Sequence, residues 1–135
     1  MLPRSTTQRG FTVAISSDAA IDYDGLMQAN LFRVFSERDA EKRLLAIQEL
    51  YAEDAVLNDP QASVRGSAAI SEAVTTLLSS LPPDFAFRAT SPAIGHHGLG
   101  RLQWRGGPPN GPAVVTGTDI AQIEAGRIKW LHVFI

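Results

Sequence analysis

The amino-acid sequence predicts an α+β domain, in which helices from the first part of the chain cover an antiparallel sheet formed by the last part. Two observations lead to this prediction. Up to about residue 81, apolar residues recur at three- and four-residue steps, the period of an amphipathic helix. After Pro83 the chain has the character of strands separated by glycine- and proline-rich turns. Helices followed by a run of strands are typical of the α+β class.

The first part of the chain is expected to form three helices and one short strand. Helices are predicted over residues 22–36, with Asp18 or Asp22 as the cap, at about 40–52, and from Gly66–Ser67 to the Pro82–Pro83 pair. Residues 55–57 are predicted as a short strand that ends at Asn58-Asp59-Pro60, because the residue before a proline is disfavoured in helical conformation.

Four strands are expected after the third helix, over residues 85–94, 99–105, 113–123 and 128–135. In the last of them, Trp130, His132 and Phe134 share one face, and Leu131, Val133 and Ile135 share the other. Both faces are apolar, although a sheet with helices on one side should have a polar outer face. We therefore expect a homodimer through the face with Trp130, His132 and Phe134. The alternative is that the N-terminal arm covers this face.

Composition narrows the class of protein. The 135 residues are expected to form a single domain over 21–135, with 1–20 as an N-terminal arm, although the basic, hydroxyl-rich start of the chain also resembles a targeting segment. A net charge of −2 predicts no binding to nucleic acid or to an anionic membrane, and no apolar run is long enough for a membrane span. The absence of cysteine excludes disulfides and a cysteine nucleophile, and a cytoplasmic location is the default expectation.

One carboxylate, Asp119, falls on an apolar face of a predicted strand. Alternation places it on the side of Val115, Gly117, Ala121 and Ile123. A carboxylate among apolar neighbours is costly unless it is paired, hydrogen-bonded or protonated. Asp119 is therefore predicted to be either the working group of a pocket or the ion-pair partner of an arginine on a neighbouring strand. The candidate partners are Arg88, Arg101 and Arg105.

Three segments, in this order and spacing, resemble the nuclear transport factor 2-like superfamily, and its SnoaL-like group in particular. They are residues 50–60, residues 64–70, and the series formed by Trp104, Gly117-Thr118-Asp119 and Gly126-Arg127-Ile128. The resemblance covers roughly residues 20–135. It implies a cystatin-like cone, in which a curved sheet wrapped by helices encloses a hydrophobic pocket.

The resemblance also implies site residues. Asp59, just before Pro60, matches the position of the aspartate base of ketosteroid isomerases. Asp119 matches their second, protonated aspartate and the acid/base aspartate of polyketide cyclases. The isomerases also use a tyrosine late in the first helix, where this chain has Leu31, Phe32 and Phe35. Steroid isomerisation is therefore not expected.

The leading functional prediction is cofactor-free acid/base catalysis, of the isomerase, cyclase or dehydratase type, on a small hydrophobic carbonyl or polyketide-like compound. Asp119 would move the proton and Asp59 would assist. The residues expected to line or polarise the cavity are Tyr51, Trp104, His97, Phe35 and Val133. His96 and His97 are expected to face opposite sides of a strand, so no metal site is predicted. The alternative is a non-catalytic module that binds a hydrophobic ligand or a partner.

Overall fold

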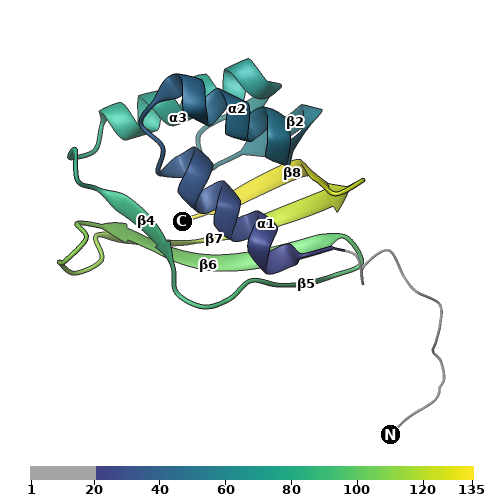
Figure 1. Cartoon of the computed structure of the whole chain (residues 1–135). Helices are drawn as coiled ribbons and strands as arrows, with labels where there is room; N and C mark the ends of the chain where they lie inside the picture. Colours follow the sequence, from purple (N-terminus) through teal and green to yellow (C-terminus); the bar gives the residue numbers. More distant parts are fainter. Residues whose placement is uncertain (1–20) are drawn as a thin grey trace, which may run out of the picture.

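Three helices pack on one face of a curved sheet in the computed structural model of the protein, which describes residues 21–135 (Figure 1). The predictions made for residues 1–20 lie outside the described residues. The predicted α+β class with a helix-covered curved sheet is confirmed. Within residues 21–135, no helix is both long and apolar enough to cross a membrane.

Each helix begins where the sequence provides a cap or a turn. Helix α1 (Tyr23–Asn30) begins after Asp22, whose carboxylate accepts a hydrogen bond of 2.9 Å from the backbone N–H of Gly25, and it runs on into the π-helix η2 (Leu31–Phe35). Helix α2 (Ala40–Leu50) is capped in the same way by Asp39. Helix α3 (Ser67–Ser79) follows Gly66, whose φ of +92° favours glycine.

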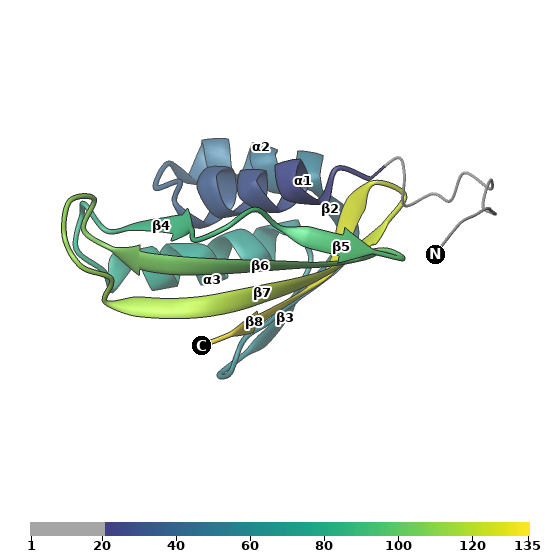
Figure 2. The same ribbon diagram turned by 90° about the horizontal axis from the view of Figure 1, so that it is seen from below.

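Seven strands form one sheet in the order β3-β2-β8-β7-β6-β4, and β5 pairs separately with β6. Their bounds are β2 (Tyr51–Asn58), β3 (Ser63–Arg65), β4 (Ala86–Ala89), β5 (Ile94–His96), β6 (Leu99–Gly107), β7 (Val115–Glu124) and β8 (Arg127–Phe134). Figure 2 shows the long strands β6 and β7 running beneath the helices, with β8 at an angle to them.

The sheet differs from the prediction in three respects. It is mixed, because β2 pairs in parallel with β8, so that Leu57 lies beside Leu131. The strand predicted over 85–94 is broken into β4 and β5, since Pro92 between them has no N–H to donate to the ladder. The short strand β3, which pairs with β2, was also not predicted.

The inner face of the sheet and the facing sides of the helices form a single apolar core. Ile47 of α2, Ile70 of α3, Leu102 of β6 and Leu131 of β8 are fully buried. Near the ends of η2 and α3 the helices and the sheet do not fill the space between them. This position holds the cavity described next.

Candidate active site

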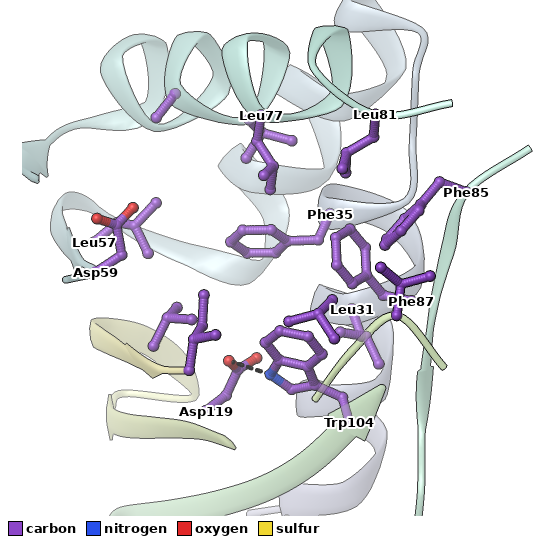
Figure 3. A pocket seen from close by; sticks show the side chains of 16 residues that line it. Leu31, Phe35, Leu57, Asp59, Leu77, Leu81, Phe85, Phe87, Trp104 and Asp119 are labelled. Carbon is purple, nitrogen blue, oxygen red and sulfur yellow. Dashed lines mark hydrogen bonds between the residues drawn. The ribbon is translucent and has the colours of Figure 1, made fainter. Parts of the chain in front are cut away.

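A cavity of about 320 Å³ lies between η2, α3 and the inner faces of strands β6, β7 and β8 (Figure 3). It is lined almost entirely by aliphatic and aromatic side chains. These are Leu31, Phe35, Leu57, Ala73, Val74, Leu77, Leu81, Phe85, Phe87, Trp104, Val114, Val115, Val133 and Ile135. The remaining two lining residues are Asp59 and Asp119. A largely apolar cavity with a few polar groups is the usual form of a small-molecule site.

Asp119 lies in the middle of β7, with Leu102 of β6 and Val133 of β8 as its register partners. Only 3% of the residue is exposed, and its Oδ1 accepts a hydrogen bond of 2.8 Å from the indole Nε1 of Trp104. Burial raises the pKa of Asp119 to about 7, and the Trp104 hydrogen bond opposes this shift only in part. Both protonation states of Asp119 are therefore populated near neutral pH.

The Trp104 indole reaches Asp119 because Gly117 has no side chain. Trp104 and Gly117 are register partners on β6 and β7, and a Cβ at Gly117 would lie 2.3 Å from Cζ2 of the indole. The ring therefore lies across β7 at Gly117, and its N–H reaches the carboxylate two residues further along that strand. Gly117 thus makes room for the hydrogen bond that holds Asp119.

The alternative prediction, an ion pair between Asp119 and an arginine, is wrong. Arg101 and Arg105 alternate with the inward-facing Leu102 and Trp104, so both arginines are exposed on the other side of β6. Arg88 is also exposed and donates to the backbone carbonyl of Pro109. Among residues 21–135, Trp104 is the side chain that hydrogen-bonds to Asp119, and Oδ2 has no partner.

Asp59 lies at the edge of the cavity, at the end of β2, on the side of Leu57 (Figure 3). Its Oδ1 accepts hydrogen bonds of 2.8 Å from the backbone N–H groups of Gln61 and Ala62. This carboxylate is exposed and closes the turn between β2 and β3. Asp59 therefore combines a turn-forming role with a position next to the cavity.

Tyr51 does not line the cavity but is buried beside it, with 1% of the residue exposed. Its hydroxyl donates a hydrogen bond of 2.5 Å to Oδ1 of Asn30, which is equally buried at the end of α1. Burial and the negative charge of Asp119 hold the pKa of Tyr51 well above its ordinary value, so the hydroxyl keeps its proton. Tyr51 and Asn30 thus form a buried polar pair that is close enough to Asp119 for its charge to act on the Tyr51 hydroxyl.

The prediction for His97 is wrong, because this residue does not line the cavity. It lies in the turn between β5 and β6 with a φ of +53°, and it is exposed. The two histidines also do not face opposite sides, since the turn brings Nδ1 of His96 to 2.9 Å from Nδ1 of His97. In the described part of the chain, no group of three or more His, Cys, Asp or Glu residues is arranged to hold a metal ion.

The structure thus brings five of the seven predicted site residues to the cavity: Asp119, Asp59, Trp104, Phe35 and Val133. Sequence reasoning missed the contribution of Asn30 and the spacing role of Gly117. Nothing in the pattern around Asn30 distinguishes it from a surface asparagine. For Gly117, the signal was a glycine within a predicted strand, which often marks a close approach by another group.

Comparisons with known proteins agree with this architecture. The profile of the SnoaL-like domain matches residues 29–131. A candidate isomerase of the SnoaL-like family from Agrobacterium tumefaciens has a similar structure, with a TM-score of 0.77 and 26% identity over 83% of this chain and 95% of that one. No curated protein matches the chain significantly.

Two more distant structures share the fold. A candidate polyketide cyclase from Sinorhizobium meliloti has a TM-score of 0.62 and 21% identity over 81% of this chain and 93% of that one. A candidate ketosteroid isomerase from Kribbella flavida has a TM-score of 0.65 and 15% identity over 90% of this chain and 81% of that one. The family profile covers most of the folded domain, including the cavity and Asp119. The chain therefore belongs to the SnoaL-like domain family.

Proposed function

We propose that the protein catalyses proton transfer on a small, uncharged carbonyl compound, with Asp119 as the acid/base. The observation that carries this proposal is the state of Asp119. It is a buried carboxyl group on the wall of an apolar cavity, without a cation beside it, and its pKa is about 7. General acids and bases are most effective when their pKa lies near the working pH.

The ionised form of Asp119 removes a proton from the carbon next to the carbonyl group of the substrate. The protonated form then returns the proton to a second carbon in an isomerisation, or to a hydroxyl group that departs as water in a dehydration. In a cyclisation the enolate carbon bonds to a second carbonyl carbon of the same molecule, and the proton goes to the oxygen of that carbonyl. These steps correspond to isomerisation, cyclisation or dehydration and require no cofactor. The candidate isomerase and polyketide cyclase among the structural relatives are in keeping with this class of reaction.

The other residues have supporting roles in this proposal. Trp104 fixes the orientation of the Asp119 carboxyl group, and Phe35 and Val133 form apolar walls that orient the substrate. Asp59 assists from the edge of the cavity as a second carboxylate. Tyr51 acts indirectly, since it does not line the cavity and its hydroxyl donates to Asn30.

Hydrogen–deuterium exchange tests the proposal without knowledge of the full reaction. A panel of small neutral ketones, including cyclohexyl methyl ketone, is incubated with the protein in D₂O, and loss of the protons next to the carbonyl is followed by NMR. We expect exchange above the buffer rate for part of the panel. Asp119→Asn should reduce the enzymatic rate by about 100-fold or more, because general acid–base catalysis contributes that much.

Glu124→Gln is the matched control, because Glu124 is an exposed carboxylate on the same strand and lies outside the cavity. This variant should exchange at the wild-type rate. If wild-type protein binds ketones from the panel but exchanges none faster than Asp119→Asn, the catalytic proposal is wrong. The cavity would then be that of a hydrophobic-ligand-binding module.

A further inference from the structure

We propose that the cavity is also a binding site for small organic ammonium ions, which the Asp119 carboxylate and the surrounding aromatic rings would hold together. This activity is independent of turnover and uses the ionised form of Asp119. It follows from the charges that line the cavity, from the arrangement of its rings and from one buried oxygen atom.

The charges that line the cavity all have the same sign. Asp59 and Asp119 are the two ionisable lining residues, and the lining contains no lysine, arginine or histidine. An anionic ligand would therefore find no opposite charge in this apolar space, where a buried unpaired charge is strongly unfavourable. A cation would instead form an ion pair with Asp119.

Three aromatic rings of the lining pack edge to face in a row that begins with Trp104, the hydrogen-bond donor to Asp119. The centroids of Phe87 and Trp104 are 5.4 Å apart with the ring planes at 90°, and those of Phe85 and Phe87 are 5.3 Å apart at 67°. Phe35 lies across the cavity from Trp104 (Figure 3). The four rings thus contribute to different parts of the lining, and an aromatic face that an alkylammonium ion contacts attracts its positive charge.

The Asp119 carboxylate has an acceptor available for such an ion. Its Oδ1 is occupied by the indole N–H of Trp104, whereas no residue in the described chain donates to Oδ2. A buried oxygen without a donor is unfavourable when ionised. A tertiary ammonium has one N–H, which can donate to Oδ2, and three alkyl groups, which can contact the aromatic and aliphatic walls.

The other charged groups around Asp119 do not replace this ligand. Tyr51, from β2, keeps its proton and donates to Asn30. The cations and the histidine on the packed helices and strands are engaged elsewhere or exposed. Arg33 pairs with Glu49, and Arg43 donates to Ser71 and Thr75. On β8, Arg127 donates to the backbone carbonyl of Gln48, Lys129 pairs with Asp54, and His132 contacts Asn58. Lys42, Arg101 and Arg105 are exposed. Asp119 thus governs how the affinity depends on pH.

Three probes that share a cyclohexyl ring test the inference. They are N,N-dimethylcyclohexylamine, which is cationic near neutral pH, cyclohexyl methyl ketone, which is neutral, and cyclohexanecarboxylate, which is anionic. Binding is followed by the fluorescence of Trp104 in a Trp130→Phe background, which removes the other tryptophan. Between about pH 6 and pH 8.5, the affinity for the ammonium should rise about tenfold as Asp119 with a pKa of about 7 becomes ionised.

In Asp119→Asn, the affinity for the ammonium should no longer depend on pH and should no longer exceed the affinity for the ketone. In Asp59→Asn, the affinity for the ammonium should still rise with pH. The inference is wrong if, near pH 8.5, the wild-type protein binds the ketone or the carboxylate as tightly as the ammonium, or if ammonium affinity does not change with pH. These readouts on the wild-type protein do not depend on the folding of a variant. Ketone exchange without ammonium binding would overturn this inference alone, whereas ammonium binding without exchange would overturn only the proposed catalysis.

Discussion

At the scale of single residues, the burial that brings the pKa of Asp119 near neutrality also lowers the stability of the folded protein when the group is ionised. A carboxyl group with a pKa near 3.8 in the unfolded chain has a pKa of about 7 in the folded protein. The folded state therefore binds the proton more tightly than the unfolded state. In the ionised form, Asp119 opposes folding by roughly 4 kcal/mol, the energy that corresponds to this difference in pKa.

This difference predicts how stability depends on pH. The contribution of Asp119 is most favourable below about pH 4, where the group is protonated in both states. This contribution to the free energy of unfolding decreases as the pH rises from about 4 to about 7. Above about pH 7, where the group is ionised in both states, the contribution no longer changes with pH. We expect the free energy of unfolding of Asp119→Asn, measured by urea denaturation, to fall less than that of the wild type between about pH 4 and pH 7.

Glu124→Gln again serves as the control, because this exposed side chain should leave the wild-type pH profile in place. Parallel profiles for the wild type and Asp119→Asn would contradict the raised pKa. Other pH-dependent contributions are common to the wild type and Asp119→Asn and cancel when the two profiles are compared.

Asp119 could be predicted from the sequence because alternation along a strand is a local rule, and it places the carboxylate among apolar neighbours. His97 was misplaced because the strand predicted over residues 85–94 is really two strands, and the turn after the second leads away from the cavity. The bond between Trp104 and Asp119 depends on the register of β6 and β7. Sequence periodicity does not determine that register.

At the scale of elements, strands β6 and β7 are complementary, because Gly117 of β7 leaves space for the indole of Trp104 of β6. Gly117→Ala would place a methyl group against the Trp104 indole and 2.7 Å from the backbone oxygen of Phe134. Because neither neighbour can yield freely, we expect a loss of about 2 kcal/mol in the free energy of unfolding, as is usual for overpacking a core. The displaced indole should also release Asp119, whose pKa should rise further without its donor.

Thr116→Ala is the matched control, since Thr116 is an exposed neighbour on the same strand and faces the other side of the sheet. It should leave the tryptophan fluorescence and the Asp119 titration, followed by carboxyl carbon NMR, unchanged. A Gly117→Ala protein with wild-type stability and an unshifted titration would show that the indole does not depend on this space.

The helices could be predicted more accurately than the sheet. Their caps and their three- and four-residue spacing are local signals, and Asp22 and the Gly66–Ser67 start lie where these signals place them. The parallel pair of β2 and β8 has no local signal, because it joins segments that lie far apart along the chain, such as Leu57 and Leu131. The π-helix η2 has the apolar spacing of an α-helix and cannot be distinguished from one by periodicity.

At the scale of the whole molecule, the outer face of β8 remains partly exposed. Trp130 and His132 are half-buried, and Phe134 is 59% exposed beside them. On the opposite face of the same strand, Leu131 is buried and Val133 lines the cavity. Homodimer formation through the outer face therefore stays a prediction, as does a cytoplasmic location.

Light scattering after size-exclusion chromatography tests the dimer. We expect the wild-type protein to have the mass of two chains, and Phe134→Glu to shift it towards one, because a charge would be buried in the contact. Phe32→Glu is the control, since Phe32 is 75% exposed on the helical side of the molecule. A wild-type monomer at high protein concentration, or equal effects of the two substitutions, would contradict the proposed face.

The pairing of β2 with β8 also has a kinetic consequence. It brings Leu57 beside Leu131, which requires closing one of the longest loops in the domain. Contacts between distant segments form slowly, since the entropy of loop closure opposes them before they are made. Until β2 pairs with β8, Leu57 is absent from its place in the cavity wall. Ligands of the cavity should therefore bind only after this pairing has formed and slow the unfolding of the completed domain.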